Sequence, residues 1–317
     1  MTELGSAALT ALRDCLGLRP SETLLILTDP PMAELARVFA RVARALAREV
    51  LVTEYSEREL NGQEPPPPVP ALMAAVDVVL AVTSRSITHT AARRAATASG
   101  GRVATMPGLT QDCLIRTMNA DYRAIAERSH RVAEMLTRAR VAHLSSDHGT
   151  DLTLPIDGIV AIASTGLILH RGQWGNLPSG EAYLRPLEGR SEGVLVVDGS
   201  LAGLGKLTQP VRITVREGVA VGVDGGEEAE RFSAQLEHVG PLARSVAELG
   251  VGTNDRAVLT GNILEDEKIL GTVHIAFGNN TSLGGSVDVP FHVDGIVLYP
   301  TLTLDGQVVI DRGVPRF

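Results

Sequence analysis

Cysteine, aromatic residues and long apolar runs are all scarce in this sequence, and each scarcity excludes a class of protein. Cys15 and Cys113 are the only thiols among 317 residues, which rules out a disulfide framework or a zinc knuckle and fits a reducing compartment. Aromatic residues make up 3% and no basic stripe occurs, so a nucleic-acid surface has little to be built from. The longest uncharged apolar stretch, residues 158–169, is shorter than the roughly 20 residues of a membrane-spanning helix. We therefore expect a soluble cytoplasmic protein with no membrane or nucleic-acid partner.

Length and charge indicate two domains of different character. A chain of this length suits two domains of roughly 150 residues each. Residues 1–150 carry 17 Arg against 16 acidic residues, so the acidic excess behind the net charge of −8 lies in the remainder. An acidic domain suits a site that collects divalent cations. We place the predicted domains at residues 1–147 and 148–317.

Buried strands alternate with amphipathic helices in the first domain. Short runs rich in Val, Ile and Leu predict strands at residues 23–29, 49–55, 76–83 and 102–105. Apolar residues at helical spacing predict helices at residues 32–48, 88–99 and 122–139. This alternation predicts an open α/β domain with a mostly parallel sheet.

The second domain consists of short apolar runs that are cut by Gly and Asp. This texture predicts antiparallel strands and hairpins, for example at residues 193–198, 210–215 and 219–223. Helices are predicted at residues 227–236 and 242–249. We expect a β-rich α+β domain.

Several familiar catalytic signatures are missing. The sequence has no GxxxxGK[ST] phosphate loop, no GxGxxG after a first strand and no GxSxG nucleophile elbow. Cys113 lies on a predicted helix, where a buried apolar thiol is the usual explanation. The sequence therefore offers no obvious nucleophile for covalent catalysis and no motif for binding a dinucleotide.

Residues of the metal-binding types gather in the second domain instead. His292 and Asp294 alternate along a predicted strand and so share a face, and His274 lies upstream of them. Alone, such a pair is more often structural, but Glu181, Glu248 and the acidic run 265–267 also lie beside glycines or in irregular junctions. Carboxylates and imidazoles together suit two divalent ions such as Zn, Co or Mn, which activate water for hydrolysis.

Four ordered motifs in this region resemble the aminopeptidase T and aminopeptidase S metallopeptidase family. The likeness extends to residues 86–96 (SITHTAARRAA) and 105–109 (TMPGL) and covers most of the chain. The four motifs are NLPSGE (176–181), AELGVGTN (247–254), EDEK with GTVHIAFGNN (265–280) and FHVDG (291–295).

The resemblance implies a specific site and reaction. It implies that a homodimer with an α/β domain and a catalytic domain cleaves a small amide or the N-terminal aminoacyl bond of a short peptide. Glu248 would bridge the two metal ions, and Glu267 would act as a general base or a further ligand. The metal ligands that it implies are Glu181, Glu248, His274, His292 and Asp294.

The sequence departs from the peptidases at one place. They have a tyrosine shortly after the histidine that corresponds to His274, where this chain has Asn279, Asn280 and Thr281. A phenol that would polarise the scissile carbonyl is therefore missing. Tyr183 and Tyr299 are candidate replacements, and the spacing favours neither.

A sister branch of the same superfamily, the 2,5-dihydroxypyridine 5,6-dioxygenases, opens an aromatic ring at a single non-haem iron. This branch resembles the present chain less at two positions, because it has a histidine in place of Glu248 and a serine near the position of His274. We therefore favour a two-metal hydrolase. A ring-opening dioxygenase with Fe(II) and a non-enzymatic binding protein for a small ligand remain the alternatives.

Three residues outside the motifs are candidates for substrate binding. His89 is predicted to lie near the carboxyl end of a strand, where α/β domains bind ligands. Arg171 and Trp174 come just before NLPSGE and are placed to line a substrate pocket.

Overall fold

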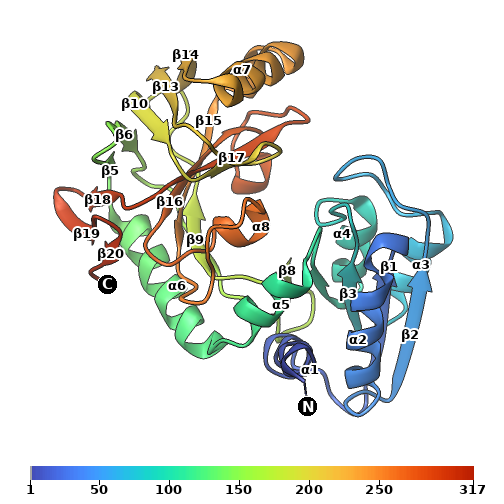
Figure 1. Ribbon diagram of the computed structural model, residues 1–317. Helices are drawn as coiled ribbons and strands as arrows, with labels where there is room; N and C mark the ends of the chain where they lie inside the picture. The colour runs from blue at the N-terminus through green and yellow to red at the C-terminus, as the bar shows by residue number, and fades with distance from the viewer. Residues whose placement is uncertain (1) are drawn as a thin grey trace. The chain divides into compact units, whose positions relative to one another are not determined.

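The computed structural model describes residues 2–317, which divide into two compact units (Figure 1). Unit 1 consists of the chain up to Arg123 together with Gly166–Ser179, and unit 2 consists of Ala124–Thr165 and Gly180–Phe317. This division differs from the predicted boundary after residue 147, because residues 132–144 pack into the core of unit 2 and the chain then returns to unit 1. Within residues 2–317, no helix combines the length and the apolar character that crossing a membrane requires.

Unit 1 is built on a five-stranded sheet in which every neighbouring pair is parallel, in the order β2-β1-β3-β4-β8. This confirms the predicted α/β domain, and β1, β3 and β4 are buried as their apolar sequences require. The strands are β1 (Thr23–Thr28), β2 (Glu49–Glu54), β3 (Val78–Val82), β4 (Arg102–Thr105) and β8 (Trp174–Asn176).

The helices of unit 1 have short amphipathic sequences, and capping residues begin some of them. Thr90 and Thr110 accept backbone hydrogen bonds at the starts of α4 and α5. Helix α2 ends at Ala43, earlier than the predicted residue 48. The helices are α1 (Glu3–Leu9), α2 (Ala33–Ala43), α3 (Pro68–Ala74), α4 (Ala91–Ala98) and α5 (Gln111–Met118).

Unit 2 contains two antiparallel sheets whose side chains share one hydrophobic core, which confirms the predicted β-rich domain. The long helix α6 (Tyr122–Arg138), which begins at the boundary between the units, and α7 (Glu227–Val239) contribute to the same core. The eight-stranded sheet contains β5 (Val141–Ser145), β6 (Asp151–Pro155), β10 (Glu192–Val197), β13 (Val211–Arg216), β14 (Val219–Asp224), β18 (Thr301–Leu304), β19 (Gln307–Asp311) and β20 (Val314–Pro315).

The seven-stranded sheet of unit 2 has the order β12-β11-β17-β16-β15-β9-β7. Four of its strands, β9, β15, β16 and β17, carry the predicted metal ligands Glu181, Glu248, His274, His292 and Asp294. The strands are β7 (Ile162–Ser164), β9 (Glu181–Leu184), β11 (Ser200–Leu201), β12 (Gly205–Lys206), β15 (Val246–Gly252), β16 (Val273–Gly278) and β17 (His292–Val297), and the short helix α8 (Ile263–Asp266) precedes β16.

The helix predicted over residues 242–249 is wrong. A single 3-10 turn, Pro241–Arg244, is followed directly by β15, in which all seven residues are buried. Strands β9 and β16 pair with β15 on either side and satisfy its backbone hydrogen-bonding groups. Glu248 therefore lies within a central strand, next to a register shift between Val246 and Glu248 in the pairing of β15 with β16.

Candidate metal centre

The predicted metal ligands share one face of the seven-stranded sheet. Along β9, Ala182 and Leu184 belong to the hydrophobic core, so Glu181 takes the opposite face. The same alternation places Leu249 and Ile275 in the core and leaves the intervening positions on the second face. Glu248, His274 and Asp294 occupy that face on three neighbouring strands, β15, β16 and β17.

Small residues between these side chains make room for them. Gly250 pairs with His274 across β15 and β16, and a Cβ placed on Gly250 would lie 1.9 Å from His274 Nε2. Ala276 pairs with both Glu248 and Asp294 and carries only a methyl group. The glycine at position 250 is thus required by the close approach of the imidazole ring.

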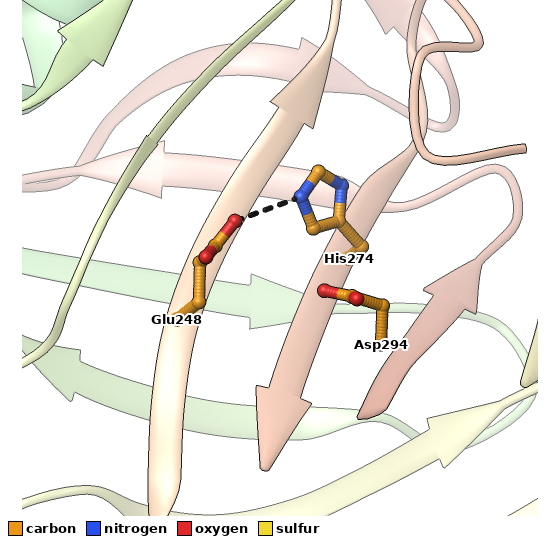
Figure 2. A group of neighbouring side chains, drawn as sticks. All are labelled: Glu248, His274 and Asp294. Carbon is orange, nitrogen blue, oxygen red and sulfur yellow. Dashed lines mark hydrogen bonds and ion pairs between the residues drawn. The ribbon is translucent and has the colours of Figure 1, made fainter. Parts of the chain in front are cut away.

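Glu248, His274 and Asp294 form a candidate metal site. Each offers one ligand atom, and these atoms all lie within 4.8 Å of one another. Figure 2 shows the three side chains converging from adjacent strands, with His274 Nε2 3.4 Å from Glu248 Oε1. His274 Nδ1 is buried and has no hydrogen-bond partner in the described part of the chain. The donor set of imidazole and carboxylates fits a divalent transition metal.

His292 completes the group from the solvent side. Its Nε2 lies 3.7 Å from Glu248 Oε2 and 3.6 Å from Asp294 Oδ1. Its Nδ1 donates to the backbone carbonyl of Asn279 at 2.8 Å, which fixes the ring and leaves Nε2 directed at the carboxylates. The side chain is 36% exposed, so water reaches the site at His292.

A buried lysine, Lys268, lies on the side of the group formed by Glu181 and Glu267. The sequence motifs did not single it out. Lys268 Nζ donates to Glu181 Oε1 at 2.7 Å and also to Glu267, and its side chain is 1% exposed. The second oxygen of Glu181 lies 3.6 Å from His274 Nε2. Lys268 therefore holds Glu181 in place while one Glu181 oxygen faces the site. The signal in the sequence was a basic residue directly after an acidic run.

Negatively charged carboxylates surround the two histidines of this group. Burial lowers the pKa of both histidines, but the surrounding carboxylates outweigh it and raise the pKa of His274 to about 9 and that of His292 to about 10. Burial raises the pKa of Asp294, yet His292 and its other cationic neighbours lower it to about 2. Burial raises the pKa of Glu267 to about 7, against the opposing effect of Lys268. A divalent cation would replace the protons that the histidines hold.

The structure brings together the predicted metal ligands, and their role as ligands stays a prediction. Two acids of the EDEK motif, Glu265 and Asp266, form hydrogen bonds with the backbone instead. Glu265 accepts from the backbone N–H of Val258, and Asp266 accepts from the backbone N–H groups of Thr260 and Gly261, so both shape the loop before α8. Of the three acids in this run, Glu267 is the one whose carboxylate accepts from the Lys268 ammonium.

The three predicted substrate-binding residues lie in unit 1 and are not one cluster. The rings of His89 and Trp174 meet edge to face with centroids 5.7 Å apart, and the Arg93 guanidinium lies 3.9 Å from the Trp174 ring centroid. Arg171 instead donates to the backbone carbonyl of Ser99. Their role in substrate binding stays a prediction.

The two candidate replacements for the missing tyrosine have different environments. Tyr299 is 73% exposed and follows β17 in a left-handed backbone conformation. Tyr183 lies on β9 opposite Gly250, two positions from Glu181. Burial raises the pKa of Tyr183 above its ordinary value, and the charges of Glu181 and Glu248 raise it further. Tyr183 is thus the phenol on the metal-binding face.

Comparisons with known proteins agree with this architecture. A sequence profile of the family NicX, 2,5-dihydroxypyridine 5,6-dioxygenase, matches residues 10–316. The solved structure of 2,5-dihydroxypyridine dioxygenase from Pseudomonas putida KT2440 is similar, with a TM-score of 0.84 and 18% identity over 99% of this chain and 98% of that one. AmpT from Thermus thermophilus is also similar, with a TM-score of 0.74 and 20% identity over 99% of both chains. A search of curated protein sequences finds no match.

Proposed function

Because the chain belongs to the 2,5-dihydroxypyridine 5,6-dioxygenase family, we propose that it is a metal-dependent enzyme that opens a hydroxylated pyridine ring with molecular oxygen. The observation that carries this proposal is the set of two histidines and several carboxylates on three neighbouring strands. Two histidines and one carboxylate are the ligands of many non-haem iron(II) oxygenases. Ring opening therefore takes precedence over the hydrolysis that the sequence motifs favoured.

Each residue has a distinct part in this proposal. His274, His292 and Asp294 would hold an iron(II) ion, with Glu248 beside them as a further ligand. The ion would supply the one-electron chemistry that molecular oxygen requires. The carbonyl of Asn279 orients His292, and Lys268 balances the charge of Glu181.

Glu267 is proposed to handle protons. Its carboxyl group is held by Lys268 and is part of the same charged group as Glu181 and Asp294. A carboxyl with a pKa of about 7 can accept or release a proton at its oxygen near neutral pH, as a general acid or base must.

One observation favours a second candidate, a two-metal hydrolase. The two oxygens of Glu248 face different histidines, Oε1 toward His274 at 3.4 Å and Oε2 toward His292 at 3.7 Å. A carboxylate that spans two nitrogen donors is suited to bridging two ions such as Zn, Co or Mn. Such a pair of ions would activate water for attack on a small amide.

Metal content and oxygen consumption together test the proposal. The protein is purified without a chelator or a histidine tag, and its metals are counted by elemental mass spectrometry. It is then loaded anaerobically with Fe(II), and oxygen consumption is followed after 2,5-dihydroxypyridine is added. E248Q is measured alongside, with E127Q as the matched control because Glu127 is exposed on α6.

The two candidates predict different results. Ring opening predicts about one iron per chain and oxygen uptake that depends on 2,5-dihydroxypyridine, both unchanged in E127Q. About two Zn, Co or Mn per chain, lost in E248Q, with hydrolysis of aminoacyl amides and no oxygen uptake, would replace ring opening by the hydrolase. Absence of any metal after reconstitution would exclude both.

A further inference from the structure

Tyr183 is the one tyrosine on the face of the sheet that carries the metal-binding residues. It alternates along β9 with Ala182 and Leu184, which both pack into the hydrophobic core of unit 2. Its side chain therefore points to the same face as Glu181. The sheet thus delivers a phenol to the side of the metal centre.

Across the sheet from Tyr183, the imidazole of His274 takes the place of a side chain at Gly250. Its direct partner on β15 is Gly250, which has no side chain, and the next residue in that row is His274 on β16. Glu248 is two positions from Gly250 and is therefore a diagonal neighbour of Tyr183, within reach of a long side chain. The phenol thus lies beside the donors that would hold the ion.

The hydroxyl of Tyr183 has no structural task in the described chain. Within residues 2–317, no hydrogen bond to the Tyr183 hydroxyl is formed, although the side chain is half-buried. A phenylalanine would fill the same space equally well. A half-buried hydroxyl without a partner is available to donate a hydrogen bond to a ligand.

We infer that the Tyr183 hydroxyl donates a hydrogen bond to an oxygen atom of the substrate bound at the metal centre. This inference rests on the proposed function, in that it requires a substrate held by the ion. It assigns Tyr183 a part in selecting substrates that bear a ring hydroxyl or carbonyl oxygen near the ion. A ligand without such an oxygen gains nothing from the phenol, which makes Tyr183 a specificity-determining residue.

The experiment compares ligand binding by Y183F, wild type and Y299F. Tyr299→Phe is the matched control because it removes the same hydroxyl from an exposed position. Each protein is loaded with Fe(II) under anaerobic conditions and its metal is counted. Dissociation constants are then measured by calorimetry for two probes, 2,5-dihydroxypyridine and acetohydroxamate, a small bidentate oxygen ligand of many metals.

The loss of one ligand hydrogen bond predicts about tenfold weaker binding of an oxygen-bearing probe to Y183F. Metal content and thermal stability should match those of wild type, and Y299F should bind as wild type does. Equal affinity of Y183F and wild type for both probes would overturn the inference, as would a wild type that binds neither. If wild type binds acetohydroxamate but not 2,5-dihydroxypyridine, the proposed substrate fails, and the acetohydroxamate affinity of Y183F alone decides the role of Tyr183.

Discussion

The imidazole of His274 lies against the backbone of Gly250, so closely that a single methyl group at position 250 would lie 1.9 Å from Nε2. Gly250→Ala should therefore displace the ring and move a proposed metal ligand out of its place. We expect at least a tenfold loss of metal affinity, and about 1–3 kcal/mol of lost stability from overpacking. Metal titration and chemical denaturation measure the two effects.

Gly222→Ala is the control for that substitution. Gly222 also lies in a strand of unit 2, β14, but a Cβ there would be 3.7 Å from its nearest neighbour, an ordinary contact. G222A should bind metal as wild type does. Equal metal affinity of G250A and G222A would show that His274 tolerates the displacement.

Lys268 neutralises two buried carboxylates, those of Glu181 and Glu267. Lys268→Met would leave both acids without their cation, and breaking a buried ion pair from one side costs about 3–5 kcal/mol. Urea denaturation of the metal-free protein should show this loss. Lys206→Met, at an exposed position in β12, is the matched control and should be close to neutral. A K268M protein as stable as K206M would mean that Glu181 and Glu267 do not need the ammonium.

A metal ion that binds only the folded chain should stabilise it. At an ion concentration about 100 times the dissociation constant, the expected gain is about 2.7 kcal/mol. Thermal denaturation with and without Mn²⁺ should show a higher midpoint for wild type. His292→Ala should reduce the shift, whereas His130→Ala, at an exposed position on α6, should keep it. Equal shifts in both variants would remove His292 from the site.

Stability at acid pH should depend on an ion pair in unit 1. Arg102 donates to both oxygens of Glu22, at 2.9 and 2.8 Å, and is itself 4% exposed. Partial burial raises the pKa of Glu22, but the hydrogen bonds from Arg102 outweigh it and the pKa is lowered overall. A lowered pKa means that the pair stabilises the folded protein above the ordinary glutamate value of 4.5 and loses this effect as the pH falls through the folded-state value.

Glu22→Gln tests this dependence. At pH 7 the variant should be less stable than wild type by about 3 kcal/mol, since it leaves a buried guanidinium without its carboxylate. The difference should shrink as the pH is lowered below 4.5, where the wild-type carboxyl also becomes neutral. Denaturant titrations at several pH values measure it. A difference that stays constant down to pH 2 would assign the effect to packing.

Local sequence patterns predicted most elements of unit 1 because its strands are short buried runs between amphipathic helices. The pattern failed at β15, where residues 246–252 form a strand only because β9 and β16, distant in sequence, pair with it on both sides. The convergence of His274, His292 and Asp294 was suggested by strand alternation and by motif likeness. The ion pair of Lys268 with Glu181 was not, since it joins residues 87 positions apart in the chain.

The sequence contained part of the information needed to choose between Tyr183 and Tyr299 as the phenol near the site. Alternation along β9 already places Tyr183 on the side of Glu181, but using it requires knowledge that residues 181–184 form a strand with its neighbours in the core. The turn that exposes Tyr299 depends on a left-handed backbone conformation at a non-glycine residue, which no local pattern indicates.

The last strand of unit 1, β8, is separated from β4 by residues 106–173, which include α6, β5, β6 and β7. During synthesis, the ribosome therefore makes a substantial part of unit 2 before the residues that complete the parallel sheet of unit 1 exist. The sheet of unit 1 cannot close as the nascent chain emerges, and a ribosome that stalled before residue 174 would leave β4 as an open edge. The sheet of unit 1 can consequently be completed only after residues 124–165 of unit 2 have been made, but before residues 180–317, which supply most of unit 2, exist.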